Sequence, residues 1–181
     1  VTVGGRSCVI SQTGFSGEAG FEIYLRDATL YADDMWDAVL EAGKKHNLMV
    51  IAPAHHRRIQ AGILSWGQDL DHEHNPFQCN LGYQVSLSGK GEWEKKADYV
   101  GKEALEKMKA ELADGKKPYK LQLVGFELGG KPIDEYAPDF WLVSPEDGGD
   151  PCGFITSPWF HPEKGKNIAM GYIPFDGTLN A

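Results

Sequence analysis

The chain has 181 residues, of which 41% are hydrophobic and 11% aromatic, so it can form one folded domain with a core, or two small ones. Its formal net charge of −8, with no segregated basic patch, disfavours nucleic-acid binding, because phosphate backbones repel an acidic surface. Three widely spaced cysteines without a CxxC pair, and no apolar run near the roughly 18 residues of a membrane span, predict a cytoplasmic protein without a disulfide framework or membrane attachment.

The N-terminal region is predicted to contain two strands joined by a glycine-rich turn. Residues 1–13 include a short apolar run, Cys8-Val9-Ile10, and the segment TGFSGEAG (13–20) has three glycines in eight residues. The segment GFEIYL (20–25) follows, with the β-branched and aromatic residues that are typical of a strand.

A carboxylate in the middle of the second strand needs an explanation. Side chains alternate along a strand, so Phe21, Ile23 and Leu25 should share an apolar face, and Glu22 and Tyr24 the opposite one. From these six residues alone, a solvated Glu22 and a Glu22 that faces a binding pocket are both possible.

Three helices are predicted further along the chain. The first covers residues 29–46, with apolar residues at a spacing of three to four and Asn47 able to end it. The second covers roughly 53–64 with Pro53 in its first turn, and the third covers about 98–113. The sequence predicts a loop over residues 65–77 and a strand over residues 81–87.

The pattern of apolar and turn-forming residues changes near residues 115–118. Short apolar runs separated by Gly, Pro and Asp turns predict a β-rich module of barrel or sandwich type. The predicted strands cover residues 121–128, 140–143, 153–156 and 168–173.

Several polar or aromatic groups could have either a functional or a structural role. His72-Glu73-His74 suggests metal ligands, but the other ligands are not evident, and we expect no metal. The run His55-His56-Arg57-Arg58 is better explained as an anion-facing or solvated helix patch than as a catalytic one. Asp69 and Asp71 are typical of turns, although they could act as an acid–base pair. Trp66 and Trp159 could each line a pocket or pack under a loop.

Longer segments, taken together, resemble the aminomethyltransferase family, which comprises the T-protein of glycine cleavage and its relatives. The segments that carry the resemblance are SQTGFSGEAGFEIYL (11–25), MWDAVLEAG (35–43), IQAGILSWGQDLD (59–71), NPFQCNLGYQV (75–85), DYVGKEAL (98–105), LVGFEL (123–128) and CGFITSPWFHPEKGKNIAMGYIP (152–174). They follow the family order over nearly the whole chain.

The resemblance implies an α+β fold with a folate-binding core of the T-protein type, built from ferredoxin-like α/β elements, followed by the start of a C-terminal β-barrel module. It assigns residues 1–87 to the core, 88–117 to a connecting segment with a helix and 118–181 to the incomplete barrel. It also implies that the chain is the later part of a longer protein, whose N-terminal region holds much of the substrate pocket.

The resemblance also implies tetrahydrofolate as the cofactor and assigns roles to four residues. Glu22 would grip the pterin, because a carboxylate can accept from a ring N–H and an exocyclic amine at once. Phe15 would lie beside the folate, and Trp66 would complete the aromatic set of the pocket. Tyr24 is the catalytic candidate, as a folate contact or as an acid toward a departing oxygen.

Two departures from the family pattern bear on the reaction. Ala54 stands where glycine-cleavage members carry an arginine that helps to hold folate, and Gln12 replaces another arginine. Together with the later segments, these departures predict an O-demethylase that transfers a methyl group from a small methoxy-aromatic acid to N5 of tetrahydrofolate. The alternatives are a glycine-cleavage aminomethyltransferase, a dimethylsulfoniopropionate demethylase and, in a different class, a folate-binding domain without turnover.

Overall fold

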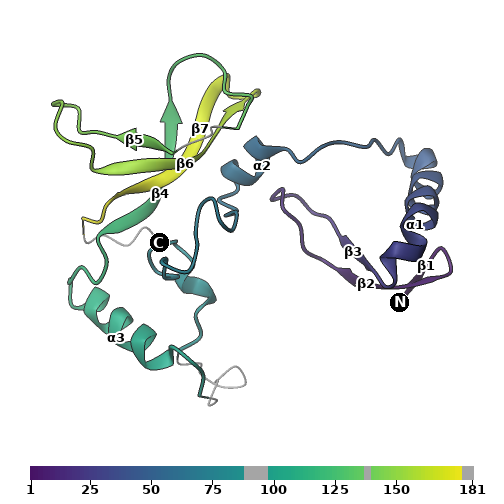
Figure 1. Ribbon diagram of the computed structural model, residues 1–181, viewed down its shortest axis with the longest axis horizontal. Helices are drawn as coiled ribbons and strands as arrows, with labels where there is room; N and C mark the ends of the chain where they lie inside the picture. The colour runs from purple at the N-terminus through teal and green to yellow at the C-terminus, as the bar shows by residue number, and fades with distance from the viewer. Residues whose placement is uncertain (88–97, 137–139, 177–181) are drawn as a thin grey trace. The chain divides into compact units, whose positions relative to one another are not determined.

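The computed structural model describes residues 1–87, 98–136 and 140–176, and Figure 1 shows the elements that they form. The chain divides into two compact units, Val1–Ile63 and Leu64–Ala181, each of which is described by itself. The structure is a mixed α/β fold with small sheets, as predicted. No helix in the described part of the chain combines the length and the apolar character needed to cross a membrane.

The first unit is a small antiparallel sheet with helices (Figure 1). Its strands lie in the order β1-β2-β3, and the two predicted strands correspond to β2 and β3. The elements are β1 (Thr2–Val3), β2 (Arg6–Ser11), β3 (Glu22–Leu25), α1 (Ala28–Gly43), the 3-10 helix η1 (Lys44–His46) and α2 (His55–Gln60).

The apolar face of this sheet is covered at one end and open at the other. Cys8 lies opposite Leu25, so the two share a face, and Cys8 is only 2% exposed. Arg6, on the same face of β2, reaches α1 through an ion pair with Asp34 (2.6 Å). Farther from this contact, exposure rises to 40% at Ile23 and 69% at Phe21. The predicted apolar face therefore exists, but among the described residues α1 covers only its beginning.

The helices of the first unit agree with the prediction at one site and differ at another. Asn47 adopts the left-handed conformation (φ 56°) that ends η1, as predicted for this position. Helix α2 is much shorter than the predicted 53–64, because its N-cap is Ala54 and the chain turns at Gly62 (φ 68°). Pro53 lies before the helix rather than in its first turn.

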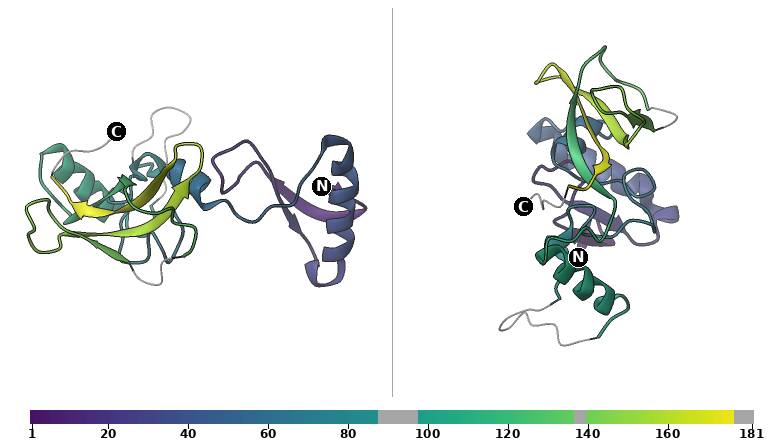
Figure 2. Two further views of the ribbon diagram at one scale, coloured as in Figure 1. Left: turned by 90° about the horizontal axis from the view of Figure 1, so that it is seen from above. Right: turned by 90° about the vertical axis from the view of Figure 1, so that its left-hand side faces the viewer.

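The second unit contains a four-stranded antiparallel sheet in the order β4-β7-β6-β5. All four strands were predicted, although β6 extends well beyond residue 156. Figure 2 shows β6 and β7 running side by side. The elements are the 3-10 helix η2 (Gly82–Gln84), α3 (Lys102–Ala113), β4 (Leu121–Leu128), β5 (Trp141–Val143), β6 (Gly153–His161) and β7 (Lys166–Pro174).

Two sequence predictions for the second unit are wrong in detail. Residues 81–87 form η2 and its flanks rather than a strand, because Gly82 lies against the ring of Phe77 and the chain turns through Asn80 (φ 59°). Helix α3 begins after Gly101 (φ 88°), not at residue 98. The predicted division at residues 87 and 117 stays a prediction, and residues 88–97 lie outside the described part.

Asp69 ties the loop after α2 to the sheet of the second unit. Its side chain is buried, with Oδ1 accepting from the hydroxyls of Thr156 and Ser157 (2.5 Å each) and Oδ2 from the backbone N–H of Ser65 (2.8 Å). The hydroxyl of Tyr172 donates to the Asp69 carbonyl oxygen at 2.7 Å. Asp69 therefore acts as a structural acceptor, as turn aspartates commonly do.

We expect Asp69→Ala to lower the free energy of unfolding of the second unit by about 3 kcal/mol, because the two hydroxyls and the N–H lose a charged acceptor. Urea titration followed by tryptophan fluorescence measures this loss. Asp150→Ala, in an exposed loop, is the matched control and should change stability by less than about 0.5 kcal/mol. Equal effects of the two substitutions would contradict the role of Asp69.

Candidate functional site

Glu22 lies in a cluster of hydroxyl groups at the start of β3. The pairing of β2 with β3 sets Ser11 opposite Glu22, and the chain leaves β2 toward Thr13. The Thr13 hydroxyl, which lies 3.0 Å from Ser11 Oγ, donates to Glu22 Oε2. The Tyr24 hydroxyl donates to the same oxygen at 3.2 Å. Glu22 and Tyr24 therefore share a face, as the alternation predicts.

The two oxygens of the Glu22 carboxylate differ in their surroundings. Both hydroxyl donors use Oε2, and no described residue donates a hydrogen bond to Oε1. Each carboxylate oxygen can accept about two hydrogen bonds. The half-buried Glu22 can therefore accept a further donor at Oε1 without losing a protein contact.

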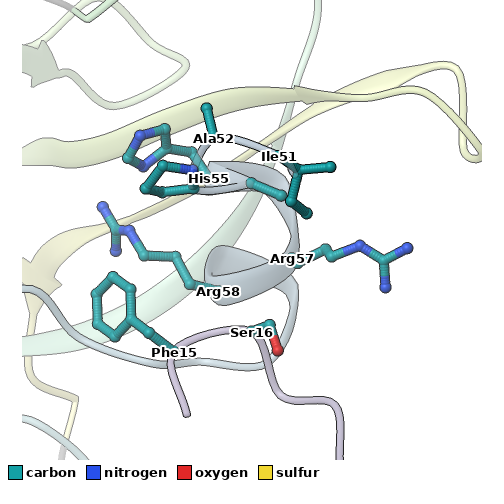
Figure 3. Close-up of a pocket in the computed structure, with 9 residues that line it drawn as sticks. Phe15, Ser16, Ile51, Ala52, His55, Arg57 and Arg58 are labelled. Carbon is teal, nitrogen blue, oxygen red and sulfur yellow. The ribbon is translucent and has the colours of Figure 1, made fainter. Parts of the chain in front are cut away.

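A pocket of about 330 Å³ lies in the same unit, between the glycine-rich turn and the region around α2. Figure 3 shows Phe15 and Arg58 side by side in its wall, while Arg57 points away from them. The pocket is lined by Phe15, Ser16, Ile51, Ala52, Pro53, Ala54, His55, Arg57 and Arg58. Its lining combines one aromatic ring, an apolar segment and basic groups of α2.

Arg58 places a buried positive charge beside an aromatic ring. Its side chain is 2% exposed, and its Nη1 donates to the carbonyl of Ile63 at 3.2 Å. Its guanidinium carbon lies 5.6 Å from the centre of the Phe15 ring, within the range of a cation–π contact. Arg57 instead forms an exposed ion pair with Glu18 at 3.1 Å. The pocket wall therefore suits a ligand with an aromatic part and negative charge.

Gly17 explains how the turn is held against α2. It has a φ of 77°, and a Cβ there would lie 2.4 Å from the Cβ of Ala61. Only glycine allows this approach without displacing the end of the helix. The close contact positions Phe15, two residues earlier, in the wall of the pocket.

His55 is held toward its neutral form by its surroundings. Partial burial, followed by the positive charge of Arg58, lowers the pKa of His55 below its usual 6.5. A neutral imidazole at this position can accept or donate a hydrogen bond inside the pocket.

Trp66 belongs to the second unit, where it is largely exposed. Its ring meets His72 edge-on, with centroids 4.9 Å apart. His74 Nδ1 lies 2.7 Å from Asp71 Oδ1, so the two histidines of the His72-Glu73-His74 segment have different partners. Across the residues that the structure describes, no three His, Cys, Asp or Glu side chains gather in a way that could hold a metal ion.

The structure brings together some of the predicted site residues but not all of them. Glu22 and Tyr24 are in direct contact, whereas Phe15 lines the neighbouring pocket and Trp66 is in the other unit. Sequence reasoning missed Thr13, whose role depends on strand register. It also did not single out Arg58 from Arg57, because the burial of Arg58 is a property of the fold.

Residues 1–89 match the family described as GCVT N-terminal domain. An aminomethyltransferase from Halothermothrix orenii is 32% identical over 177 residues, covering 97% of this chain and 44% of the relative. An aminomethyltransferase from Symbiobacterium thermophilum is 34% identical, and the match covers 96% of this chain and 42% of that relative. The crystal structure of glycine cleavage system aminomethyltransferase T from Bartonella henselae matches with a TM-score of 0.65 and 26% identity, covering 91% of this chain and 41% of that one. The chain thus spans less than half the length of these proteins.

We expect the pKa of His55 to be below 6.5 in the folded protein. Between 6.5 and that lower value, the unfolded chain binds a proton that the folded chain does not, so the folded state loses stability as the pH falls through this window. An NMR titration of the imidazole signals measures the pKa, with His55→Gln assigning the resonance. A value at or above 6.5 would contradict the burial of this ring beside Arg58.

Proposed function

We propose that the chain belongs to the aminomethyltransferase family, binds tetrahydrofolate through its first unit and takes part in the transfer of a one-carbon unit to this carrier. The support is the match of residues 1–89 to the GCVT N-terminal domain and the similarity to two aminomethyltransferases. The observation that carries the proposal is the Glu22 carboxylate. It is held in place through Oε2 and can accept a ligand donor at Oε1.

The edge of a pterin suits this carboxylate. The pterin offers a ring N–H beside an exocyclic amine, which are two parallel donors, and a carboxylate can accept both. A bidentate contact with the pterin needs a free acceptor position on Glu22 Oε2. The hydrogen bond from Tyr24 to this oxygen is long, at 3.2 Å. We expect this bond, rather than that of Thr13, to give way. The Tyr24 hydroxyl would then turn toward the bound folate.

The neighbouring pocket supplies complementary surfaces for the rest of the ligand. Phe15 presents an aromatic ring, on which the aromatic ring of folate can stack. The buried guanidinium of Arg58 lies beside it and offsets negative charge, which folate carries on its glutamate carboxylates. For Trp66, a folate contact stays a prediction from the sequence.

The family comparisons favour aminomethyl transfer over the O-demethylation that the sequence led us to expect. In this reaction the carbon of a sulfur-bound aminomethyl group forms bonds to N5 and N10 of tetrahydrofolate. The bonds from this carbon to sulfur and to nitrogen break, releasing a thiol and ammonia, and the product is 5,10-methylenetetrahydrofolate. The support is that the relatives from H. orenii and S. thermophilum are both named aminomethyltransferase.

One feature of the pocket keeps O-demethylation as a second candidate. Ala54, at the N-cap of α2, stands where the resemblance implies an arginine, and it joins Ile51, Ala52 and Pro53 in an apolar wall. An apolar wall suits the aromatic ring and the methoxy group of a methoxy-aromatic acid. Transfer of the methyl to N5 would leave a phenol and 5-methyltetrahydrofolate. A sulfonium donor would give the same folate product, and a folate-binding domain without turnover would give none.

The folate product separates these reactions. The intact protein is incubated with tetrahydrofolate and, in separate reactions, an aminomethylated lipoyl carrier protein, vanillate, syringate or dimethylsulfoniopropionate, and the folate is identified by mass. We expect the methylene product with the carrier protein. A methylated product from another donor would replace aminomethyl transfer with demethylation. The absence of both folate binding and product would contradict the proposal as a whole.

Glu22→Gln should weaken tetrahydrofolate binding by about ten- to a hundredfold, because one acceptor oxygen becomes a donor and the charge assistance is lost. Equilibrium titration of the intact protein measures this change. Glu41→Gln, which removes an exposed carboxylate of α1 in the same unit, is the matched control and should leave affinity unchanged. Unchanged affinity in Glu22→Gln would rule out the pterin contact.

Tyr24→Phe should lower turnover by about a hundredfold if the hydroxyl acts near the transfer, without weakening folate binding. Binding is spared because the phenol occupies Oε2 in the structure and competes with the pterin for it. Turnover at saturating substrate and the folate dissociation constant, measured on the same preparation, separate the two effects. Wild-type turnover would show that Tyr24 is only a folate neighbour.

A further inference from the structure

The second unit contains a cavity of about 200 Å³ that the proposed function does not use. It lies between the 67–74 segment and residues of β6 and β7. Gly67, Gln68, Asp69, Leu70, Asp71, His74, Phe140, Phe154, Thr156 and Tyr172 line it. At about 30 Å³ per water molecule, its volume corresponds to a ligand of about seven heavy atoms.

One side of the cavity is a continuous series of aromatic rings. Phe154 and Tyr172 are direct partners across β6 and β7, with ring centroids 5.3 Å apart. Phe140 stacks on Phe154 at 5.6 Å with an interplanar angle of 12°. His74 lies 4.8 Å from Tyr172 at the other end of the series. The faces of phenyl and phenol rings carry partial negative charge, which attracts cations.

The polar lining of the cavity includes two carboxylates, Asp69 and Asp71, and the imidazole of His74, and none of its lining residues is Lys or Arg. The backbone N–H of Glu73, and then the hydrogen bond from His74, lower the pKa of Asp71, so this side chain is a carboxylate at neutral pH. Both contacts use Oδ1, and no residue in the described part of the chain hydrogen-bonds to Oδ2. An anionic ligand would meet repulsion from the carboxylate and the ring faces, whereas a cation would be attracted by both.

We propose that this cavity binds a small organic cation, a quaternary ammonium or a protonated tertiary amine, with its methyl groups against Phe140 and Phe154 and its charge near Asp71. The rings would supply cation–π contacts and apolar area together. The proposal does not rest on the Glu22 contact, because every lining residue belongs to the second unit and Glu22 belongs to the first.

Choline and its uncharged isostere 3,3-dimethylbutan-1-ol test the proposal directly, because they share a shape and differ in charge. Both are titrated into the whole chain, without folate, and binding is followed by calorimetry and by NMR of the ligand methyl groups. We expect choline to bind at least about tenfold more tightly than the alcohol. Equal affinity of the two probes, or no binding of choline at millimolar concentration, would overturn the proposal.

Two substitutions locate the binding in the cavity. Phe140→Leu keeps apolar volume but removes the ring, and Asp71→Asn keeps a hydrogen-bonding side chain but removes the charge. Both residues are exposed enough to be replaced without opening the core, since Phe140 is 51% exposed. Each should weaken choline binding about three- to tenfold and leave the weak affinity for the alcohol unchanged.

Tyr83→Leu and Asp150→Asn are the matched controls, because they remove an exposed ring and an exposed carboxylate of the same unit outside the cavity. Neither should change choline affinity. Thermal unfolding of all four variants checks that the second unit is intact. Wild-type choline affinity in both Phe140→Leu and Asp71→Asn would show that binding occurs elsewhere and would contradict the assignment.

Discussion

The candidate folate site depends on the register between β2 and β3. This register sets Ser11 opposite Glu22 and Cys8 opposite Leu25, so the polar and apolar groups of the hairpin are separated onto its two faces. A slip of one residue would exchange the faces, burying the carboxylate against α1 and moving the apolar residues to the site. The hydroxyl cluster of Thr13 and Tyr24 around Glu22 is a direct result of this pairing.

The two units differ in how their polar-site carboxylates, Asp69 and Glu22, are hydrogen-bonded. In the second unit the Asp69 carboxylate has donors on both of its oxygens, and it fixes a loop to the sheet. In the first unit the Glu22 carboxylate is held through one oxygen only. A fully paired buried carboxylate stabilises a fold, whereas a half-paired one at a surface is suited to a ligand. Glu22 lies within the strand segment 20–25, whereas Asp69 lies in the segment 65–77 that was predicted to be a loop.

The sequence was most informative where a local rule sets the structure. Alternation predicted that Glu22 and Tyr24 share a face, and periodicity with a left-handed Asn47 predicted the first helix and its end. The sequence prediction failed where side-chain packing outside a repeating pattern sets the structure, as in the turn of Gly82 against Phe77, which replaces the predicted strand at 81–87. The burial of Arg58 beside Phe15, and the tie from Asp69 to β6, depend on tertiary contacts that no local pattern encodes.

The most direct test of the Glu22–pterin contact is a double-mutant cycle between protein and ligand. Tetrahydrofolate and its analogue lacking the exocyclic 2-amino group are titrated against the wild-type protein and the Glu22→Ala variant. A bidentate contact predicts that loss of the amino group costs the wild type at least about tenfold in affinity and costs the variant almost nothing, which is a coupling of about 1.4 kcal/mol or more. Equal losses in the two proteins would mean that Glu22 does not contact this edge of the pterin.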